Sequence, residues 1–355
     1  MNQREIKTEI VCTIGPASRR RDTLAAMIEA GMNVARFNFA HGIFDEHGAT
    51  IVDIRAVAQA SGRRVAILAD LPGPKLRIGD LAEQQIELKR DQEFTLAVGD
   101  FTGDATRVST TFRDLPRVVK PGDTIFLNDG LVQLVVERVS GDAVHCRVPV
   151  GGPLLSHKGI NLPDVELGIS AFTARDRECL AFALAHGVDA VGQSFVQSAD
   201  DVHAVREAAR AAGRVIPVVA KIERARALQR IDEILAAADG IMVARGDLGV
   251  ETPIESIAIV QKELLRKACQ AAKPSITATQ MLLSMVENRR PTRAEVTDVT
   301  NALLDGTDSV MLSEESAVGA YPVDAVRMLS RIAKVTEAYM RSRRETAPAD
   351  PVAGT

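Results

Sequence analysis

Two apolar segments of this chain end in charged residues whose types and spacing suit a bound anion and a metal ion. The segment Val-Val-Ala-Lys-Ile-Glu ends with Lys221 and Glu223, which are two residues apart and so lie on the same side of a β-strand. The segment Ile-Met-Val-Ala-Arg-Gly-Asp-Leu-Gly-Val places Asp247 after Gly246, where glycine leaves backbone amides free for an anion. These groups predict a divalent metal that holds a phosphorylated acid. The simpler alternative is an ion pair between Lys221 and Glu223 and a tight turn at Gly246.

Other apolar segments end in groups that extend this site. Arg36 and Asn38 are also two residues apart, and the arginine fork matches the oxygens of a phosphate. The alternative for Arg36 is a pair with a neighbouring carboxylate. His41 beside a glycine is more often a packing or capping residue than a catalyst. Thr279 either binds a substrate carboxylate or caps the next helix, and no nucleotide-binding glycine motif is present.

Composition narrows the class of protein. The chain has 355 residues, of which 46% are hydrophobic and 25% charged, with a net charge of −4. This balance argues against a nucleic-acid partner, and no apolar run is long enough to cross a membrane. The N-terminal residues are polar and lack the apolar segment of a signal peptide, so we expect a cytoplasmic protein. The four cysteines have no paired spacing and predict neither a zinc site nor disulfides: Cys12, Cys146, Cys179 and Cys269.

Strand-like apolar runs alternate with segments of helical period along most of the chain. The runs are continuously apolar, as in parallel strands covered on both faces. About eight strand and helix pairs predict a (β/α)₈ TIM barrel, with a doubly wound open sheet as the alternative. The predicted strands are residues Glu9–Gly15, Asn33–Phe39, Arg64–Asp70, Val188–Phe195, Val215–Glu223, Gly240–Ala244, Ser275–Ala278 and Asp308–Leu312.

One stretch interrupts this rhythm after the third predicted strand. Short β-type runs separated by turns, including Asn-Asp-Gly at residues 128–130, predict a small all-β domain inserted at the mouth of the barrel. At that position the insertion is expected to act as a lid over the active site, and a passive decoration is the alternative. The expected domains are residues 1–74 (barrel), 75–160 (insertion), 161–340 (barrel) and 341–355 (disordered tail).

The motifs together resemble the pyruvate kinase family over nearly the whole chain, in the order in which that family has them. The resemblance implies a (β/α)₈ barrel with a β lid domain after the third strand. It also implies transfer of phosphate from phosphoenolpyruvate to ADP. Nine segments carry it: residues 10–18, 31–42, 70–79, 158–163, 220–223, 242–249, 278–281, 290–295 and 311–317.

The resemblance also implies a role for each matching residue. Glu223 and Asp247 are expected to hold Mg²⁺ or Mn²⁺, while Arg36 and Lys221 bind the transferring phosphate and Lys221 neutralises the enolate. The amides of Gly246 and Asp247, with Thr279, are expected to seat the substrate carboxylate, and Thr279 or a water it orients to help protonate the enolate carbon. Residues expected on the nucleotide side or at the lid hinge are Pro16, Asn38, His41, Arg77, Asp129, Lys158 and Asn161.

The chain departs from the family at positions that resemble a potassium site. Members that need potassium hold it with an Asn and a Ser on the second strand and an Asp and a Thr on the third. Asn38 and Asp70 are present here, but Ala40 and Leu71 have no side-chain oxygen for a hard cation. Lys75 occupies the position of a glutamate. We expect its ammonium to replace the ion, so that potassium is not required; the alternative is a solvated lysine at the lid hinge.

Other departures bear on regulation and on the last barrel strand. Members of the family continue into a third domain that binds a regulatory sugar phosphate and builds part of the tetramer, and this sequence ends before it. The expectation is therefore an enzyme without an allosteric effector site, and a homodimer formed through the barrel. Glu314 stands in place of a glycine, a change for which the sequence offers no physical account. The remaining differences are Pro72 for lysine and Leu283 for glutamate.

Two other functions are compatible with parts of this pattern. One is another enolate-forming barrel enzyme, such as a lyase acting on pyruvate, against which Arg36 and the insertion argue because a lyase has no ADP to accommodate. The other is a non-catalytic or regulatory protein derived from a kinase. The presence of Lys221, Glu223, Asp247 and Thr279 argues against it.

Overall fold

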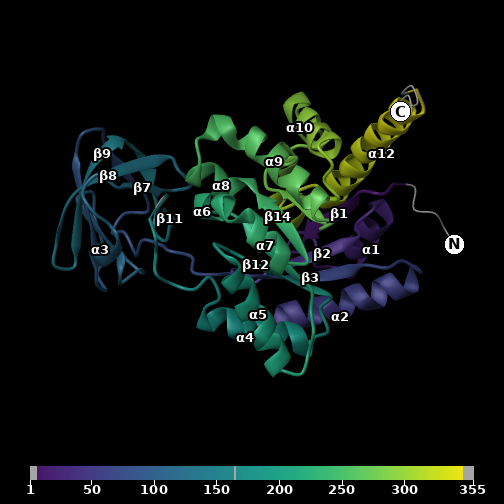
Figure 1. Cartoon of the computed structure of the whole chain (residues 1–355), viewed down its shortest axis with the longest axis horizontal. Helices are drawn as coiled ribbons and strands as arrows, with labels where there is room; N and C mark the ends of the chain where they lie inside the picture. Colours follow the sequence, from purple (N-terminus) through teal and green to yellow (C-terminus); the bar gives the residue numbers. More distant parts are fainter. Residues whose placement is uncertain (1–5, 164, 347–355) are drawn as a thin grey trace, which may run out of the picture.

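The barrel is built from eight parallel strands, as the apolar runs predict. The computed structural model describes residues 6–163 and 165–346. Its strands close in the order β1-β16-β15-β14-β13-β12-β3-β2, which confirms the (β/α)₈ TIM barrel (Figure 1). They are β1 (Glu9–Thr13), β2 (Val34–Asn38), β3 (Ala66–Leu71), β12 (Ala190–Gln193), β13 (Val218–Ile222), β14 (Gly240–Ala244), β15 (Ser275–Ala278) and β16 (Ser309–Leu312).

Helices follow the strands and cover the outside of the barrel. Local sequence sets several of their ends: Thr173 and Thr292 each form a capping box with an acidic residue three positions on, and α1 ends at Gly31 with φ of 125°. The helices are α1 (Arg21–Ala30), α2 (Phe44–Ala60), α4 (Ala174–Ala185), α5 (Ala199–Ala211), α6 (Ala225–Gln229), α7 (Ile231–Ala237), α8 (Arg245–Glu251), α9 (Ile257–Gln270), α10 (Arg293–Leu304), α11 (Glu314–Ala317) and α12 (Pro322–Thr346), with 3₁₀ turns at Ile254–Ser256 and Leu283–Val286.

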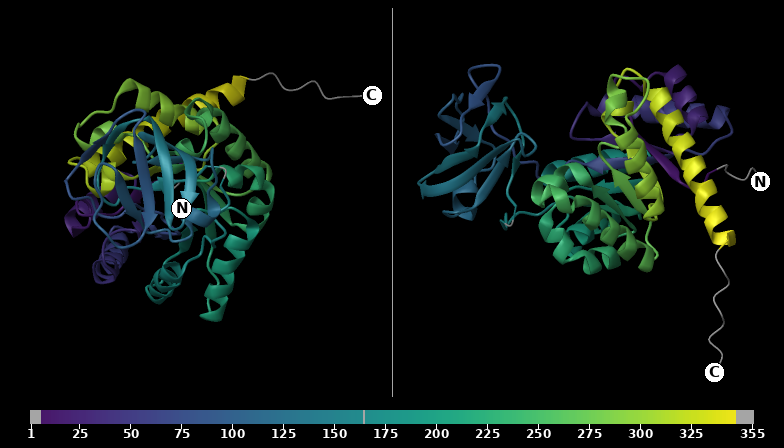
Figure 2. Two further views of the ribbon diagram at one scale, coloured as in Figure 1. Left: turned by 90° about the vertical axis from the view of Figure 1, so that its left-hand side faces the viewer. Right: turned by 90° about the horizontal axis from the view of Figure 1, so that it is seen from above.

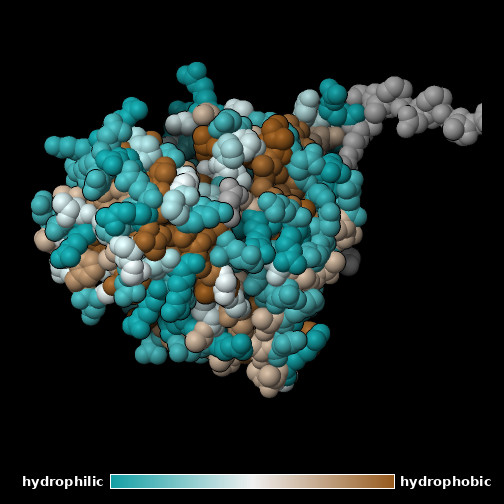
Figure 3. All heavy atoms as spheres, turned by 60° about the vertical axis from the view of Figure 1, so that its left-hand side comes forward, coloured by the Kyte–Doolittle hydropathy of each residue, from teal (hydrophilic) through white to brown (hydrophobic). Residues whose placement is uncertain are grey.

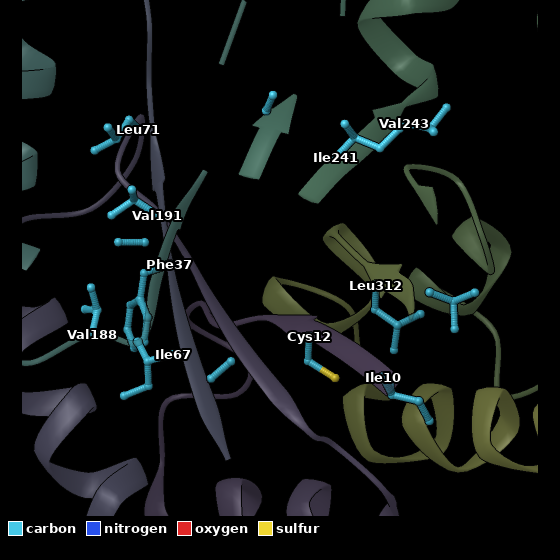
Figure 4. Close-up of a cluster of buried hydrophobic side chains, with 14 of the residues drawn as sticks. Ile10, Cys12, Phe37, Ile67, Leu71, Val188, Val191, Ile241, Val243 and Leu312 are labelled. Carbon is cyan, nitrogen blue, oxygen red and sulfur yellow. The ribbon is translucent and has the colours of Figure 1, made fainter. Parts of the chain in front are cut away.

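Apolar side chains fill both sides of the barrel wall. Those pointing outward pack beneath the helices, among them Phe37, Ile67 and Leu71 (Figure 4). A smaller cluster that includes Leu68 and Met242 forms a separate core. This double burial accounts for the uninterrupted apolar runs in the sequence.

The β insertion, comprising strands β4 to β11, lies to one side of the barrel (Figures 1 and 2). Six of its strands form a sheet in the order β11-β7-β8-β9-β5-β6, and β10 pairs with β4. The predicted Asn-Asp-Gly turn connects β7 to β8, with positive φ at Asn128, Asp129 and Gly130. The elements are β4 (Ile86–Leu88), β5 (Glu93–Val98), β6 (Arg107–Thr110), α3 (Leu115–Val118), β7 (Thr124–Leu127), β8 (Val132–Ser140), β9 (Ala143–Val150), β10 (Gly152–Leu154) and β11 (Ile160–Asn161).

The insertion has an apolar core of its own. Phe94, Leu96 and Val108 are fully buried in it, and Leu162 and Leu167 beyond the last strand belong to the same cluster. The domain boundaries at residues 74 and 160 stay predictions. Two cores in one chain indicate that the insertion and the barrel respond separately to core substitutions.

The C-terminal prediction needs a correction. Residues 341–346, expected to begin a disordered tail, continue helix α12, because arginine and glutamate are good helix formers. Arg341, Ser342 and Arg343 are exposed, as expected for a solvated helix end; residues 347–355 lie outside the described residues.

Among the helices that the structure describes, none is long and apolar enough to span a membrane. The face seen in Figure 3 is mostly hydrophilic, with apolar patches between hydrophilic side chains.

Phe94→Ala tests the independence of the two cores. Removing this fully buried ring is expected to destabilise the insertion by about 3–5 kcal/mol. Hydrogen exchange should then become faster across β5, β8 and β9, while exchange in the barrel strands stays unchanged. Phe101→Ala, at a partly exposed ring of the insertion, is the control and should have a smaller effect. Equal acceleration in the barrel would show that the two parts unfold as one unit.

Candidate active site

The interior of the barrel changes from apolar to polar along the strands. Successive strand residues alternate between the two faces, so the inward positions recur every second residue. Near the carboxyl ends, where barrel enzymes place their chemistry, these positions carry polar groups. The polar layer consists of Thr13, Arg36, Asp70 and Lys221, and two positions before each lie Val11, Val34, Leu68 and Val219.

Asp70 joins the two cations of this layer. The Nε of Arg36 donates to its Oδ2 at 2.7 Å, and the Nζ of Lys221 lies 3.2 Å from its Oδ1. Another hydrogen bond, from Nη1 of Arg36 to Oγ1 of Thr13 at 2.9 Å, fixes the plane of the guanidinium. Asp70 is 1% exposed. The predicted alternative for Arg36, a pair with a neighbouring carboxylate, is therefore part of the site.

Lys221 lies at the centre of the polar layer. Its Nζ is 2.8 Å from Oε1 of Glu223 and donates to Oγ of Ser194 at 2.6 Å. The prediction that Lys221 and Glu223 share one side of the strand is confirmed, and the two do form an ion pair. Ser194, which follows β12, was not predicted. Its position at the end of a barrel strand was the only signal for it.

Burial and charge work against each other in this network. Burial alone would raise the pKa of Asp70, but Lys221 and Arg36 hold that pKa below its ordinary value. Burial would likewise lower the pKa of Lys221, and Asp70 and Glu223 raise it above the ordinary value. The ammonium of Lys221 is thus kept charged although it is buried. Gly192 on the adjacent strand leaves room for this arrangement, because a Cβ there would lie 3.2 Å from Oδ1 of Asp70.

The first turn of helix α8, which begins directly after β14, meets the turn after β15. The amide of Gly246 donates to Oγ1 of Thr279 at 2.8 Å, and that hydroxyl donates to the carbonyl of Ala278 at 2.6 Å. Thr279 has φ of 69°, a strained value for a β-branched residue. Arg245 holds the strained backbone, because its Nη2 donates to the Thr279 carbonyl at 2.8 Å. Thr279 therefore belongs to the mouth of the barrel, where its hydroxyl accepts from a first-turn amide of α8.

Two carboxylates of the site suit a divalent cation. Burial raises the pKa of Glu223; Lys221 opposes this rise, and the negative charges of Asp247 and Asp70 add to it. A doubly charged cation would remove this repulsion, and carboxylates are ligands that Mg²⁺ accepts. Within residues 6–163 and 165–346, no cluster of three or more His, Cys, Asp or Glu side chains forms a metal site by itself. Glu223 and Asp247 can thus hold a metal that takes its other ligands from substrate or water.

A cleft between the β insertion and the barrel brings together residues predicted for the nucleotide side and the metal. Lys75, Asp129, Asn161 and Asp247 line it. Near it, burial lowers the pKa of His41, and the charges of Lys75, Arg77 and Arg36 lower it further. The three cationic side chains around His41 give this region a positive charge that attracts anions.

Other predicted residues have different surroundings. The Oδ1 of Asn38 accepts from the backbone N–H of Ala40 at 3.1 Å, which stabilises its own turn. Arg77 donates to the carbonyl of His157 at 2.7 Å within the insertion. Lys158 is partly exposed and its carbonyl accepts from Ile78. Pro16 is exposed in the turn after β1.

The structure corrects one step of the potassium argument. Leu71 packs in the core beneath the helices (Figure 4), on the face of β3 opposite to Asp70. Its side chain therefore does not face the site, and its lack of an oxygen says little about a cation there. The missing side-chain oxygen at Ala40 and the positive charge of Lys75 still bear on whether potassium is required. Glu314 is exposed at the first residue of α11, where a negative charge is favourable.

Comparison with known proteins supports the motif-based resemblance. The family model described as pyruvate kinase, barrel domain, matches residues 5–326. The pyruvate kinase of Thermococcus litoralis is 54% identical over 95% of this chain and 71% of its own length. The enzyme of Mycobacterium tuberculosis is 48% identical over 91% and 69%, and that of Thermotoga maritima 44% identical over 93% and 71%. Together with the closed barrel and its polar mouth, these matches show that the chain belongs to the pyruvate kinase family, a family of phosphotransferases.

Proposed function

We propose that this protein transfers the phosphoryl group of phosphoenolpyruvate to ADP, giving pyruvate and ATP in a Mg²⁺- or Mn²⁺-dependent reaction. The observation that carries the proposal is the buried network of Arg36, Asp70, Lys221 and Glu223 at the mouth of the barrel. It presents two cations to a phosphate and a carboxylate to a metal. The family match supports the same reaction.

The charge of each residue determines its role in the proposed reaction. Glu223 and Asp247 would hold the metal, which would supply positive charge to the phosphate and the enolate oxygen. Arg36, held rigid by Asp70 and Thr13, binds the transferring phosphate. Lys221 is kept protonated beside its carboxylates and stabilises the negative charge that develops on the enolate oxygen.

The carboxylate end of the substrate is held where the start of α8 meets the turn after β15. The backbone amides of Gly246 and Asp247, with the hydroxyl of Thr279, bind the substrate carboxylate. Thr279, or a water that it orients, then delivers the proton to the enolate carbon. The hydrogen bond between Gly246 and Thr279 supports this role, because it shows that the two groups lie within reach of one ligand.

The nucleotide enters between the β insertion and the barrel. Lys75 and Arg77 give the region around His41 a positive charge, and Asp129 and Asn161 line the cleft from the insertion side. We place the diphosphate of ADP there, with the insertion closing as a lid that excludes water.

A coupled assay of pyruvate release with phosphoenolpyruvate, ADP and Mg²⁺ tests the reaction directly. Release that depends on ADP supports phosphoryl transfer. If the protein were a lyase, its rate would not depend on ADP. If it were a non-catalytic protein, no pyruvate would be released. Retention of the complete charge network favours the kinase over both.

Lys221→Met is expected to lower kcat by at least about a hundredfold, because the lost cation stabilises charge that forms in the transition state. The circular dichroism spectrum should remain that of the native fold. Lys262→Met, which removes an exposed lysine paired with Asp305, is the matched control and should retain activity. Wild-type turnover in Lys221→Met would remove Lys221 from the mechanism.

Glu223→Ala and Asp247→Ala are expected to weaken metal binding. The concentration of Mn²⁺ needed for half-maximal activity should rise in both, and excess Mn²⁺ should restore part of the rate. Glu233→Ala, which removes a carboxylate from an exposed pair with Arg230, should leave this concentration unchanged. Unaltered metal affinity in both site variants would show that these carboxylates are not ligands.

We further propose that the enzyme needs no potassium, because the ammonium of Lys75 supplies a fixed positive charge near the phosphate. The influence of Lys75 on the pKa of His41 supports this placement. Activity should be unchanged when potassium replaces a bulky ammonium salt at constant ionic strength.

The reverse substitution provides the matching experiment. Lys75→Glu combined with Ala40→Ser removes the fixed cation and adds an oxygen ligand, so activity should become dependent on potassium. Arg90→Glu, a charge reversal at an exposed arginine of the insertion, controls for net charge. Strong activation of the unmodified enzyme by potassium would contradict the proposal.

A further inference from the structure

A buried ion pair lies close in the chain to the two carboxylates assigned to the metal. The Nε of Arg224 is 3.3 Å from Oε2 of Glu251, and the two side chains are 5% and 1% exposed. Neither residue was predicted from the sequence, and neither has a role in the mechanism above. Both are of types that are rarely buried without a specific partner.

Arg224 also reaches the hinge through which the chain returns from the β insertion to the barrel. Its Nη2 donates to the carbonyl of Leu162 at 3.1 Å and lies 3.4 Å from that of Val165. On the other side of the pair, Glu251 lies near the side chain of Asn161 and the backbone of Ala225, whose polar groups lower its pKa against the effect of burial. The pair therefore connects the hinge, the turn after β13 and helix α8.

The positions of Arg224 and Glu251 in the chain link this connection to the two metal carboxylates. Arg224 directly follows Glu223, and Glu251 is four residues after Asp247 on α8, so Asp247 and Glu251 lie on one face of that helix. The charge of Asp247 accordingly acts on Glu251. The contact between Arg224 and Glu251 thus fixes the backbone behind Glu223 at a set distance from the helix that carries Asp247.

Stability alone does not account for such a pair. Removing two charges from water costs several kcal/mol per ion, and apolar residues of similar volume often stabilise a protein as well or better. Exposed pairs in the same region, Arg226 with Glu166 and Arg230 with Glu233, avoid that cost. What the buried pair adds is a defined geometry, since one guanidinium contacts a carboxylate and two carbonyls at once.

We propose that Arg224 and Glu251 are positioning residues: their buried ion pair sets the separation of Glu223 and Asp247 and ties both carboxylates to the hinge of the β insertion. The first part rests on the proposed function, because it takes Glu223 and Asp247 as metal ligands. The second part, the link to the hinge, stands on the hydrogen bonds alone.

The test measures Mn²⁺ affinity by electron paramagnetic resonance of the free ion, without substrate or turnover. Arg224→Met and Glu251→Gln are each expected to weaken Mn²⁺ binding about tenfold. The double variant should show nearly the same loss as either single variant, because the two residues act as one unit. Hydrogen exchange of residues 160–167 and 246–251 should become faster in both single variants.

Two neighbouring arginines serve as matched controls. Arg226→Met removes an exposed link to Glu166 on the same hinge side, and Arg230→Met removes an exposed pair on α7. Both should retain wild-type Mn²⁺ affinity and hinge exchange. If Arg224→Met does not fold, Arg224→Lys replaces it, since lysine keeps the charge but cannot hold Glu251 and the hinge carbonyls together. Wild-type affinity and exchange in both Glu251→Gln and the folded Arg224 variant would overturn the proposal.

The two readouts separate this proposal from the proposed function. If the unmodified protein does not bind Mn²⁺, the metal assignment of Glu223 and Asp247 fails, and hinge exchange decides the remaining part. Faster exchange at residues 160–167 in Arg224→Met than in Arg226→Met then supports the link to the hinge. Equal exchange in the two variants refutes it.

Discussion

The pairing of Asp70 with Arg36 and Lys221 is the interaction on which the site depends. Without this carboxylate, two cations would lie buried together near the mouth of the barrel, where each carries a desolvation cost of several kcal/mol. Asp70 and Glu223 balance them charge for charge. The fold provides the place for this balance, because alternation on parallel strands directs side chains from β1, β2, β3 and β13 into one layer. The same pairing keeps Lys221 charged, which is the state that electrophilic stabilisation requires.

Strain in the surrounding turns is consistent with a site whose geometry is imposed by the scaffold. Thr279 and Phe195 both have positive φ, and each contributes to the mouth: Thr279 binds the amide of Gly246, and the amide of Phe195 donates to Oε2 of Glu223 at 2.8 Å. Conformations of this kind cost about 1–3 kcal/mol each and persist only where neighbouring contacts hold them. Arg245 supplies such contacts at Thr279. The stability given up in the turns is therefore offset by bonds from the rigid barrel.

Sequence patterns predict the features that depend on local periodicity. All eight barrel strands and the shared side of Lys221 and Glu223 follow from apolar runs and a period of two. Features that depend on which strands become neighbours are not accessible in this way. Ser194 and the contact between Arg224 and Glu251 require the barrel to close before the residues meet. The face of Leu71 is a different case, because strand alternation already puts it opposite to Asp70 and the potassium argument did not apply that alternation. The helical continuation to Thr346 was missed because an exposed helix end lacks the apolar period on which the prediction relied.

The two connections of the β insertion both reach the charge network. The outgoing connection leaves β3 after Leu71, one residue beyond Asp70, and carries Lys75 at the cleft. The returning connection passes the carbonyls of Leu162 and Val165, which face Arg224, the neighbour of Glu223. A rotation of the insertion therefore acts at once on the counter-ion of Arg36 and on a carboxylate of the metal pair. The barrel core is packed separately from the core of the insertion, so these two connections are where the position of the insertion bears on the charge network.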